Sequence, residues 1–192
     1  MDNLEQQIKV LGLKKGLFFG AILTALSIIS YYFIISITNS PIAFIAAPIV
    51  FSVFIPIFCV VMICFNLRKQ IGGYWTFKQA TTGIFVLLLT AYLLQLVTKD
   101  LIFDRFIEPN SAQKIQTVAL NTKYQIMKQR GEKQQVIDKS MADLRTEFNA
   151  QKNLTIGSAI QGIVFSIIFI FLLALIFGSL FKKDPPDYGV QT

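Results

Sequence analysis

The sequence predicts an all-α membrane protein, with four transmembrane helices and an extracytoplasmic helical hairpin between spans three and four. One reason is composition: 54% of the 192 residues are hydrophobic, which exceeds the share in ordinary soluble domains. The other is charge, because four continuous apolar segments contain no charged residue. Each has at least 20 residues, enough for an α-helix to cross a hydrocarbon core of about 30 Å. The four predicted spans are 16–37, 42–65, 79–98 and 154–181.

The basic residues predict the side of the membrane on which each flank lies, because Lys and Arg accumulate in cytoplasmic loops. Three lie in 1–15, three in 66–78 and two in 182–192, whereas 38–41 contains none. We therefore predict a cytoplasmic N-terminal segment (1–15), a cytoplasmic turn (66–78) and a cytoplasmic tail (182–192). The long segment 99–153 is then extracytoplasmic. The tail is expected to be disordered, with a docking peptide as the alternative.

The turn reads NLRKQIGGYWTFKQA from residue 66 to residue 80 and combines basic with aromatic side chains. Aromatic residues gather at membrane interfaces, and cations there attract anionic lipid head groups. This favours lipid anchoring, with a specific ligand or partner site as the alternative. Nucleic acid is not an expected partner, because the net charge of +7 follows from membrane topology and no nucleic-acid-binding motif accompanies it. The predicted anchoring residues are Arg68, Lys69, Tyr74, Trp75, Phe77 and Lys78.

The same turn carries a resemblance to a family. A basic pair, a glycine-containing turn and the residues FKQA entering the third span resemble the cytoplasmic signature of a bacterial membrane-protein family. That family is typical of Bacteroidota and is classed as a domain of unknown function. The resemblance covers essentially the whole chain and implies a multi-pass protein of the bacterial inner (plasma) membrane. It implies a long polar helical segment between spans three and four, and it lends no catalytic residue.

Small residues spaced four apart predict where the spans pack, because they let helix backbones approach closely. Homo-oligomerisation is the alternative to packing within the chain. The side-chain amides of Gln95 and Gln161 are expected to form an interhelical hydrogen bond, with pore lining as the alternative. Pro48 and Pro56 predict a kink in the second span or, alternatively, a gating element. The predicted packing residues are Gly16, Gly20, Ser158, Gly162, Ser166, Gln95 and Gln161.

Two apolar stripes at helical spacing flank Gly131 and predict the hairpin in 99–153. The first contains Ile115, Val118, Thr122 and Ile126. Before it, Ile102, Phe103, Phe106 and Ile107 are expected to face the outer leaflet or to continue the span. Because each stripe is narrow, the hairpin is expected to be stabilised by contact with a second copy, another membrane protein or lipid head groups. The candidate docking residues are those of the second stripe, Ile137, Met141, Leu144 and Phe148.

No residue pattern predicts catalysis. The chain has no histidine, which removes the commonest general base and metal ligand. Cys59 and Cys64 are five residues apart and would point about 140° from one another on a helix. We therefore expect no cofactor, no metal and no enzymatic activity. The predicted function is a membrane accessory or scaffold protein that belongs to, or partners with, a membrane complex. The alternative is an oligomeric small-solute channel or transporter.

Overall fold

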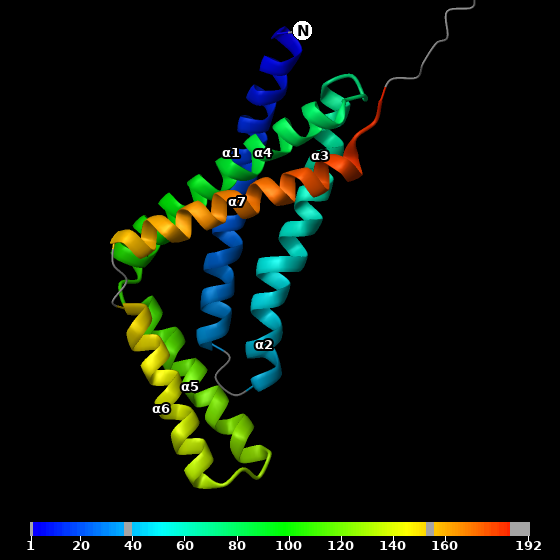
Figure 1. The fold of residues 1–192 in the computed structure, drawn as a ribbon. Coiled ribbons are helices and arrows are strands. Elements are labelled where there is room, and N and C mark those ends of the chain that lie inside the picture. Colours follow the sequence, from blue (N-terminus) through cyan, green and yellow to red (C-terminus); the bar gives the residue numbers. More distant parts are fainter. Residues whose placement is uncertain (1, 37–39, 153–155, 185–192) are drawn as a thin grey trace, which may run out of the picture. The chain divides into compact units, whose positions relative to one another are not determined.

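The computed structural model describes residues 2–36, 40–152 and 156–184, and these residues are almost entirely helical (Figure 1). Two stretches are π-helical, η1 (Val50–Phe54) and η2 (Leu96–Ile107). In the described part of the chain, the extended pairing is one antiparallel bridge between Trp75 and Lys183. The α-helices are α1 (Asp2–Ser36), α2 (Pro41–Ile49), α3 (Ile55–Gln70), α4 (Phe77–Gln95), α5 (Ser111–Gln129), α6 (Gln134–Lys152) and α7 (Ile156–Phe181).

Four helical stretches within the described ranges are long and apolar enough to cross a membrane, which confirms the four predicted apolar helices. They are Asn3–Ser36, Pro41–Gln70, Phe77–Ile107 and Gly157–Phe181. Three of them extend beyond the predicted limits, because a helix grows readily once it is nucleated. The segment 1–15, predicted as a flank, is thus helical from Asp2 onward and forms the start of α1.

The chain divides into two compact units. The first contains Met1–Ile22, Ile57–Gln95 and Val164–Thr192, and the second contains Leu23–Pro56 and Leu96–Ile163. Each of the four apolar stretches therefore contributes one end to the first unit and the other end to the second.

In the first unit, α1 packs closely on α4 through glycines. A Cβ atom added to Gly16 would lie 2.6 Å from the Leu87 carbonyl oxygen and 2.7 Å from Thr90 Cβ. At Gly20 the nearest atom would be the Ala91 carbonyl oxygen, at 2.9 Å. No side chain larger than that of glycine fits at these two positions. Gly16 and Gly20, two of the predicted packing residues, therefore lie where the backbones of α1 and α4 approach each other.

Helix α7 lies beside α4 in the same unit (Figure 1). Gly178 faces Thr81 so closely that a Cβ atom would overlap with its hydroxyl oxygen. One turn earlier, Ala174 is fully buried. The rings of Phe85 and Phe171 meet edge to face with centroids 5.8 Å apart. The contacts of Gly178 and Phe171 therefore define the face of α7 that packs against α4.

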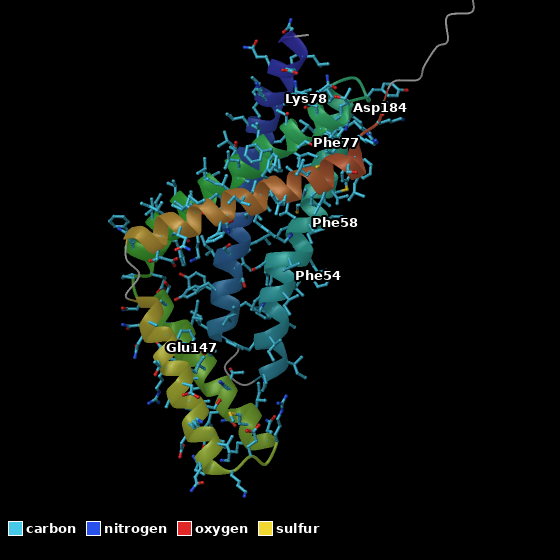
Figure 2. All side chains as sticks on the ribbon, viewed as in Figure 1. Phe54, Phe58, Phe77, Lys78, Glu147 and Asp184 are labelled. Atoms are coloured by element: carbon cyan, nitrogen blue, oxygen red, sulfur yellow. The ribbon has the colours of Figure 1, made fainter. Side chains whose placement is uncertain are left out.

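In the second unit, α5 and α6 contact one another (Figure 1). Gly131, in the turn between them, has a φ of 71°, which glycine adopts without steric cost. The predicted stripe of α6 contains its least exposed side chains: Ile137 is 3% exposed, and Met141, Leu144 and Phe148 are half-buried. The opposite face is polar and exposed, as the side chain of Glu147 illustrates (Figure 2). Helix α5 also contacts α2.

The second apolar stretch contains η1 between two of its prolines. Pro48 lies inside α2 and Pro56 at the start of α3. The Ile55 N–H donates to the Val50 carbonyl, five residues back. A proline ring clashes with the carbonyl four residues earlier, and a π-helical turn is one way to absorb that clash. Phe54 and Phe58 project from this stretch and are mostly exposed, as lipid-facing side chains would be (Figure 2).

Candidate functional site: the turn between α3 and α4

The turn between α3 and α4 is tight, and two glycines form it. Gly72 has a φ of 99° and Gly73 a φ of 86°, in the left-handed region that favours glycine. The Gly73 N–H donates to the Arg68 carbonyl at 2.9 Å, which satisfies one of the last carbonyls of α3. The chain therefore reverses within a few residues and leads directly into α4.

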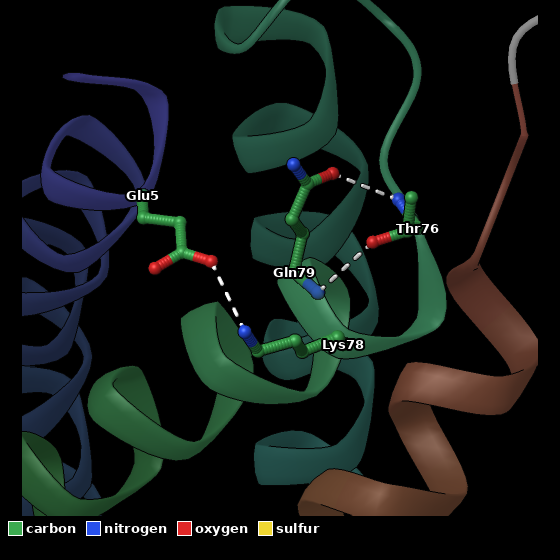
Figure 3. A network of polar contacts seen from close by, with 4 residues as sticks. All are labelled: Glu5, Thr76, Lys78 and Gln79. Carbon is green, nitrogen blue, oxygen red and sulfur yellow. Dashed lines mark hydrogen bonds and ion pairs between the residues drawn. The ribbon is translucent and has the colours of Figure 1, made fainter. Parts of the chain in front are cut away.

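A capping box fixes the start of α4 (Figure 3). The Thr76 N–H donates to Gln79 Oε1 at 2.9 Å, and the Gln79 N–H donates to Thr76 Oγ1 at 3.4 Å. This reciprocal pair satisfies two backbone donors that a helix start otherwise leaves unpaired. In the same first turn of α4, Lys78 Nζ lies 3.3 Å from Glu5 Oε1 of α1. The residues FKQA thus mark a structured helix start that is also tied to the N-terminal helix.

Trp75 joins the turn to the end of α7. Its indole Nε1–H donates to the Phe181 carbonyl at 2.7 Å. Its backbone N–H donates to the Lys183 carbonyl at 2.9 Å, and the Lys183 N–H donates to the Trp75 carbonyl at 3.1 Å. Arg68 Nη1 donates to the same Phe181 carbonyl at 3.4 Å. We call Arg68, Trp75, Phe181 and Lys183 the α7 clasp. Through it, a distant part of the chain supplies hydrogen-bond donors to the main-chain carbonyls at the end of α7.

The Trp75 ring lies in the buried interior of the first unit, where it is 1% exposed. The backbone of Gly83 on α4 leaves room for it: a Cβ atom there would lie 2.9 Å from Ile8 Cγ2, 3.4 Å from Trp75 Cζ3 and 3.5 Å from Leu67 Cδ2. Ile8 and Leu67 are themselves fully buried. Residues from α1, α3, α4 and the turn therefore form one apolar cluster around the indole.

The burial of Trp75 corrects one prediction. Trp75 was expected to anchor the turn to lipid, but a side chain that is 1% exposed cannot contact a bilayer. It is buried because its N–H reaches the end of α7 while its ring fills the cluster, a pairing that no local sequence pattern reveals. Tyr74 and Phe77 are 41% and 42% exposed, and Lys69 and Lys78 are also exposed. These four remain available to lipid, whereas Arg68 is half-buried in the clasp.

The structure places the other predicted packing residues in different surroundings. Ser158 and Ser166 are half-buried, as is Gln95. A Cβ atom added to Gly162 would meet no atom of the described residues within 4 Å. Gln161 is exposed on α7, and its hydrogen bond to Gln95 stays a prediction. Of the predicted tail, Lys182, Lys183 and Asp184 are described and exposed, and Asp184 is labelled in Figure 2. The prediction of disorder for the rest of the tail lies outside the described residues.

Four structural residues were missing from the sequence-based site. Phe181 was read only as the end of a span, although its carbonyl is the acceptor of the clasp. Gly12 packs against α4, where a Cβ atom would lie 2.8 Å from the Gly83 carbonyl oxygen. Its spacing of four from Gly16 was the available signal, but it lay outside the predicted span. Thr76 and Gln79 form a capping-box pattern that was also overlooked.

The fold and this site define the class of protein. Four apolar helices of membrane-spanning length, held together by glycine contacts and a clasp between helix ends, make this chain a multi-pass membrane protein. Among the described residues, no three His, Cys, Asp or Glu side chains are arranged to hold a metal ion.

The chain belongs to a family described as Protein of unknown function (DUF4199), whose model matches residues 14–183. The predicted membership of an uncharacterised domain family is thereby confirmed, and the link to Bacteroidota stays a prediction. No curated protein and no solved structure matches the chain.

Proposed function

We propose that this protein is a non-enzymatic accessory or scaffold protein of a bacterial inner membrane. The observation that carries the proposal is the α7 clasp, a polar site whose hydrogen bonds join the chain's own helices. The Trp75 indole and the Arg68 guanidinium both donate to one main-chain carbonyl. Groups paired in this way supply rigidity instead of substrate chemistry, which suits a protein that acts by presenting surfaces.

Both termini are proposed to be cytoplasmic, with α5 and α6 as an extracytoplasmic hairpin. The first unit brings together the start of α1, the turn before α4 and the end of α7, through the contacts of Lys78 with Glu5 and of Trp75 with Lys183. The second unit contains the start of α2 and the whole of α5 and α6. Four successive crossings would place these three span ends on one side of the membrane, and the basic residues beside them favour the cytoplasmic side.

Cysteine labelling in intact cells tests this orientation. In a chain with Cys59 and Cys64 replaced by alanine, a membrane-impermeant maleimide should label Cys introduced at Asn121 or Lys133. It should not label Cys at Lys69 or Lys182 until the cells are permeabilised. All four positions are exposed, so accessibility to the reagent depends on the side of the membrane. The reverse labelling pattern would place α5 and α6 in the cytoplasm.

The lipid bilayer is the proposed partner of the turn. Lys69, Tyr74, Phe77 and Lys78 are exposed around it, and the Lys183 ammonium lies 5.1 Å from the Tyr74 ring centroid. Cations beside aromatic rings suit an interface at which anionic head groups meet hydrocarbon. We propose that these residues hold the turn at the cytoplasmic surface.

The second proposed partner is another membrane protein or a second copy, bound through α6. Leu144 and Phe148 remain half-buried after α6 has packed, so part of each apolar side chain is open to another molecule. Ile137 is the least accessible of the four candidates, because it is 3% exposed.

Replacing Leu144 and Phe148 with serine should abolish association while the four spans stay inserted. Full burial of each side chain is worth about 1.5–3 kcal/mol, which is large for a thin helical pair. Self-association and co-purification in mild detergent are the measurements, with membrane insertion as the check. Lys139→Ala is the control on the exposed face, where a charge contributes about 0–1 kcal/mol. Unchanged association in the double variant, or its loss in the control, would contradict the docking role.

A further inference from the structure

In the second unit, two residues of η2 and the residue just after it contact α1 at intervals of five. Thr98 Oγ1 lies 2.6 Å from Thr24 Oγ1. The Phe103 ring meets the Tyr31 ring edge to face, with centroids 5.5 Å apart. The Tyr31 hydroxyl donates to Glu108 Oε2 at 3.3 Å. On an α-helix, residues five apart point about 140° from one another. A π-helix bonds residue i to residue i+5, so it brings all three onto one face.

Lys99 and Asp104 are also five residues apart, and they form an ion pair at 2.6 Å. Their side chains are only 19% and 29% exposed, so water screens the pair less than it would a surface pair. The Lys99 ammonium also lies 5.2 Å from the Phe103 ring centroid. Where η2 ends, the Glu108 N–H donates to the Phe103 carbonyl at 2.8 Å, which is the five-residue hydrogen bond of a π-helix. The ion pair therefore has the same periodicity as the backbone beneath it.

The first turn of α5 is attached to the same segment. Ser111 Oγ donates to Asp104 Oδ1 at 2.9 Å, and Lys114 Nζ donates to Glu108 Oε2 at 2.7 Å. The hydrogen bond from Lys114 lowers the pKa of the Glu108 carboxyl, and the same bond raises the pKa of Lys114. Both groups are thus charged at neutral pH. A rotation of η2 would move the Asp104 carboxylate and, just after the end of η2, the Glu108 carboxylate, and the start of α5 would follow them.

We propose that the Lys99–Asp104 ion pair is a register latch that holds 96–107 in π-helical form. A π-helix of 12 residues is unusual, because most are single turns within α-helices. When the pair is lost, the segment returns to α-helical winding, and Phe103 and Glu108 turn away from α1. The rotational setting of α5 therefore depends on whether this pair is formed. The carboxylates and hydroxyls of the network are already paired with one another, so they form a conformational device and not an open binding site.

Spin-label distances within the second unit test the latch. In a chain with Cys59 and Cys64 replaced by alanine, spin labels are placed in two pairs, 29 with 106 and 29 with 97. Ile29, Val97 and Phe106 are exposed and are not among the residues that join this segment to α1. In Lys99→Gln and Asp104→Asn, the 29–106 distance should shift by about 5–10 Å, because a helix with its side chains is about 10–12 Å across. The 29–97 distance should stay unchanged, since position 97 precedes the ion pair. The charge-swapped variant Lys99→Asp/Asp104→Lys should restore the original 29–106 distance.

The matched control is Asp138→Asn on α6. This change removes a carboxylate that accepts from Gln134 at 2.8 Å, at the ordinary four-residue spacing of an α-helix, and it should leave both distances unchanged. Unshifted 29–106 distances in both single variants would overturn the latch, as would a shift that the charge swap fails to reverse. If the single variants do not fold, the charge-swapped protein decides alone, because it must reproduce the wild-type distance.

Discussion

Replacing Trp75 with alanine is expected to lower the free energy of unfolding by about 3–5 kcal/mol, the range for large buried aromatic residues. The indole is 1% exposed, and its N–H is one of two side-chain donors to the Phe181 carbonyl. Alanine would leave a cavity between α1, α3 and α4 and would remove this donor. The measurement is an SDS titration in mild detergent, followed by circular dichroism. Tryptophan fluorescence cannot report unfolding of this variant, because Trp75 is the chain's single tryptophan.

Two further variants at and near this position separate the causes. Trp75→Phe keeps an aromatic ring and removes the N–H donor, so it should lose only about 1–3 kcal/mol. Phe77→Ala changes an aromatic residue that is 42% exposed and should cost less than Trp75→Ala. Equal losses for Trp75→Ala and Phe77→Ala would mean that the α7 clasp does not stabilise the fold.

Gly16→Ala is expected to destabilise the protein by about 1–3 kcal/mol, the usual cost of overpacking a core. The added Cβ would lie 2.6 Å from the Leu87 carbonyl oxygen, and a backbone atom cannot move aside as a flexible side chain can. Helices α1 and α4 would therefore have to separate. The fluorescence of Trp75, the only tryptophan in the chain, is a suitable probe for the unfolding titration.

Gly162→Ala is the matched control, because it is the same substitution in another apolar helix. Its Cβ would meet none of the described atoms within 4 Å, and alanine has the higher helix propensity by up to about 1 kcal/mol. Stability should be unchanged or slightly raised. If both substitutions destabilised the chain equally, close approach at Gly16 would not explain the loss.

The helical class and the four apolar helices could be predicted because they depend on local composition. A charge-free apolar run of at least 20 residues has few alternatives to a membrane-spanning helix, and this length follows from the thickness of a bilayer. The packing role of Gly16 and Gly20 could also be predicted, since spacing by four places residues on one face of an α-helix. Their partner helix α4 could not be named, because that contact joins residues far apart in sequence.

The errors concern features that depend on distant contacts or on a different period. Basic and aromatic residues near a span end resemble an interfacial belt, and Trp75 has the same local pattern whether it faces lipid or the end of α7. Phe103 was grouped with Ile102 and Phe106 on one face, yet it is 2% exposed while Phe106 is 81% exposed. A search for periods of 3.6 residues misses a π-helix. The spacing of Thr98, Phe103 and Glu108 was the signal for it.

The α7 clasp also bears on the order in which the protein is made. Trp75 and Phe181 are separated by 106 positions, and chains are synthesised from the N-terminus. The indole N–H therefore emerges long before its acceptor exists, and the clasp closes only when the last span has been completed. A ribosome that stops before residue 181 leaves the turn without this partner. Closure of the clasp is thus a late event in biogenesis, and a chain that has closed it is one whose translation has reached the final span.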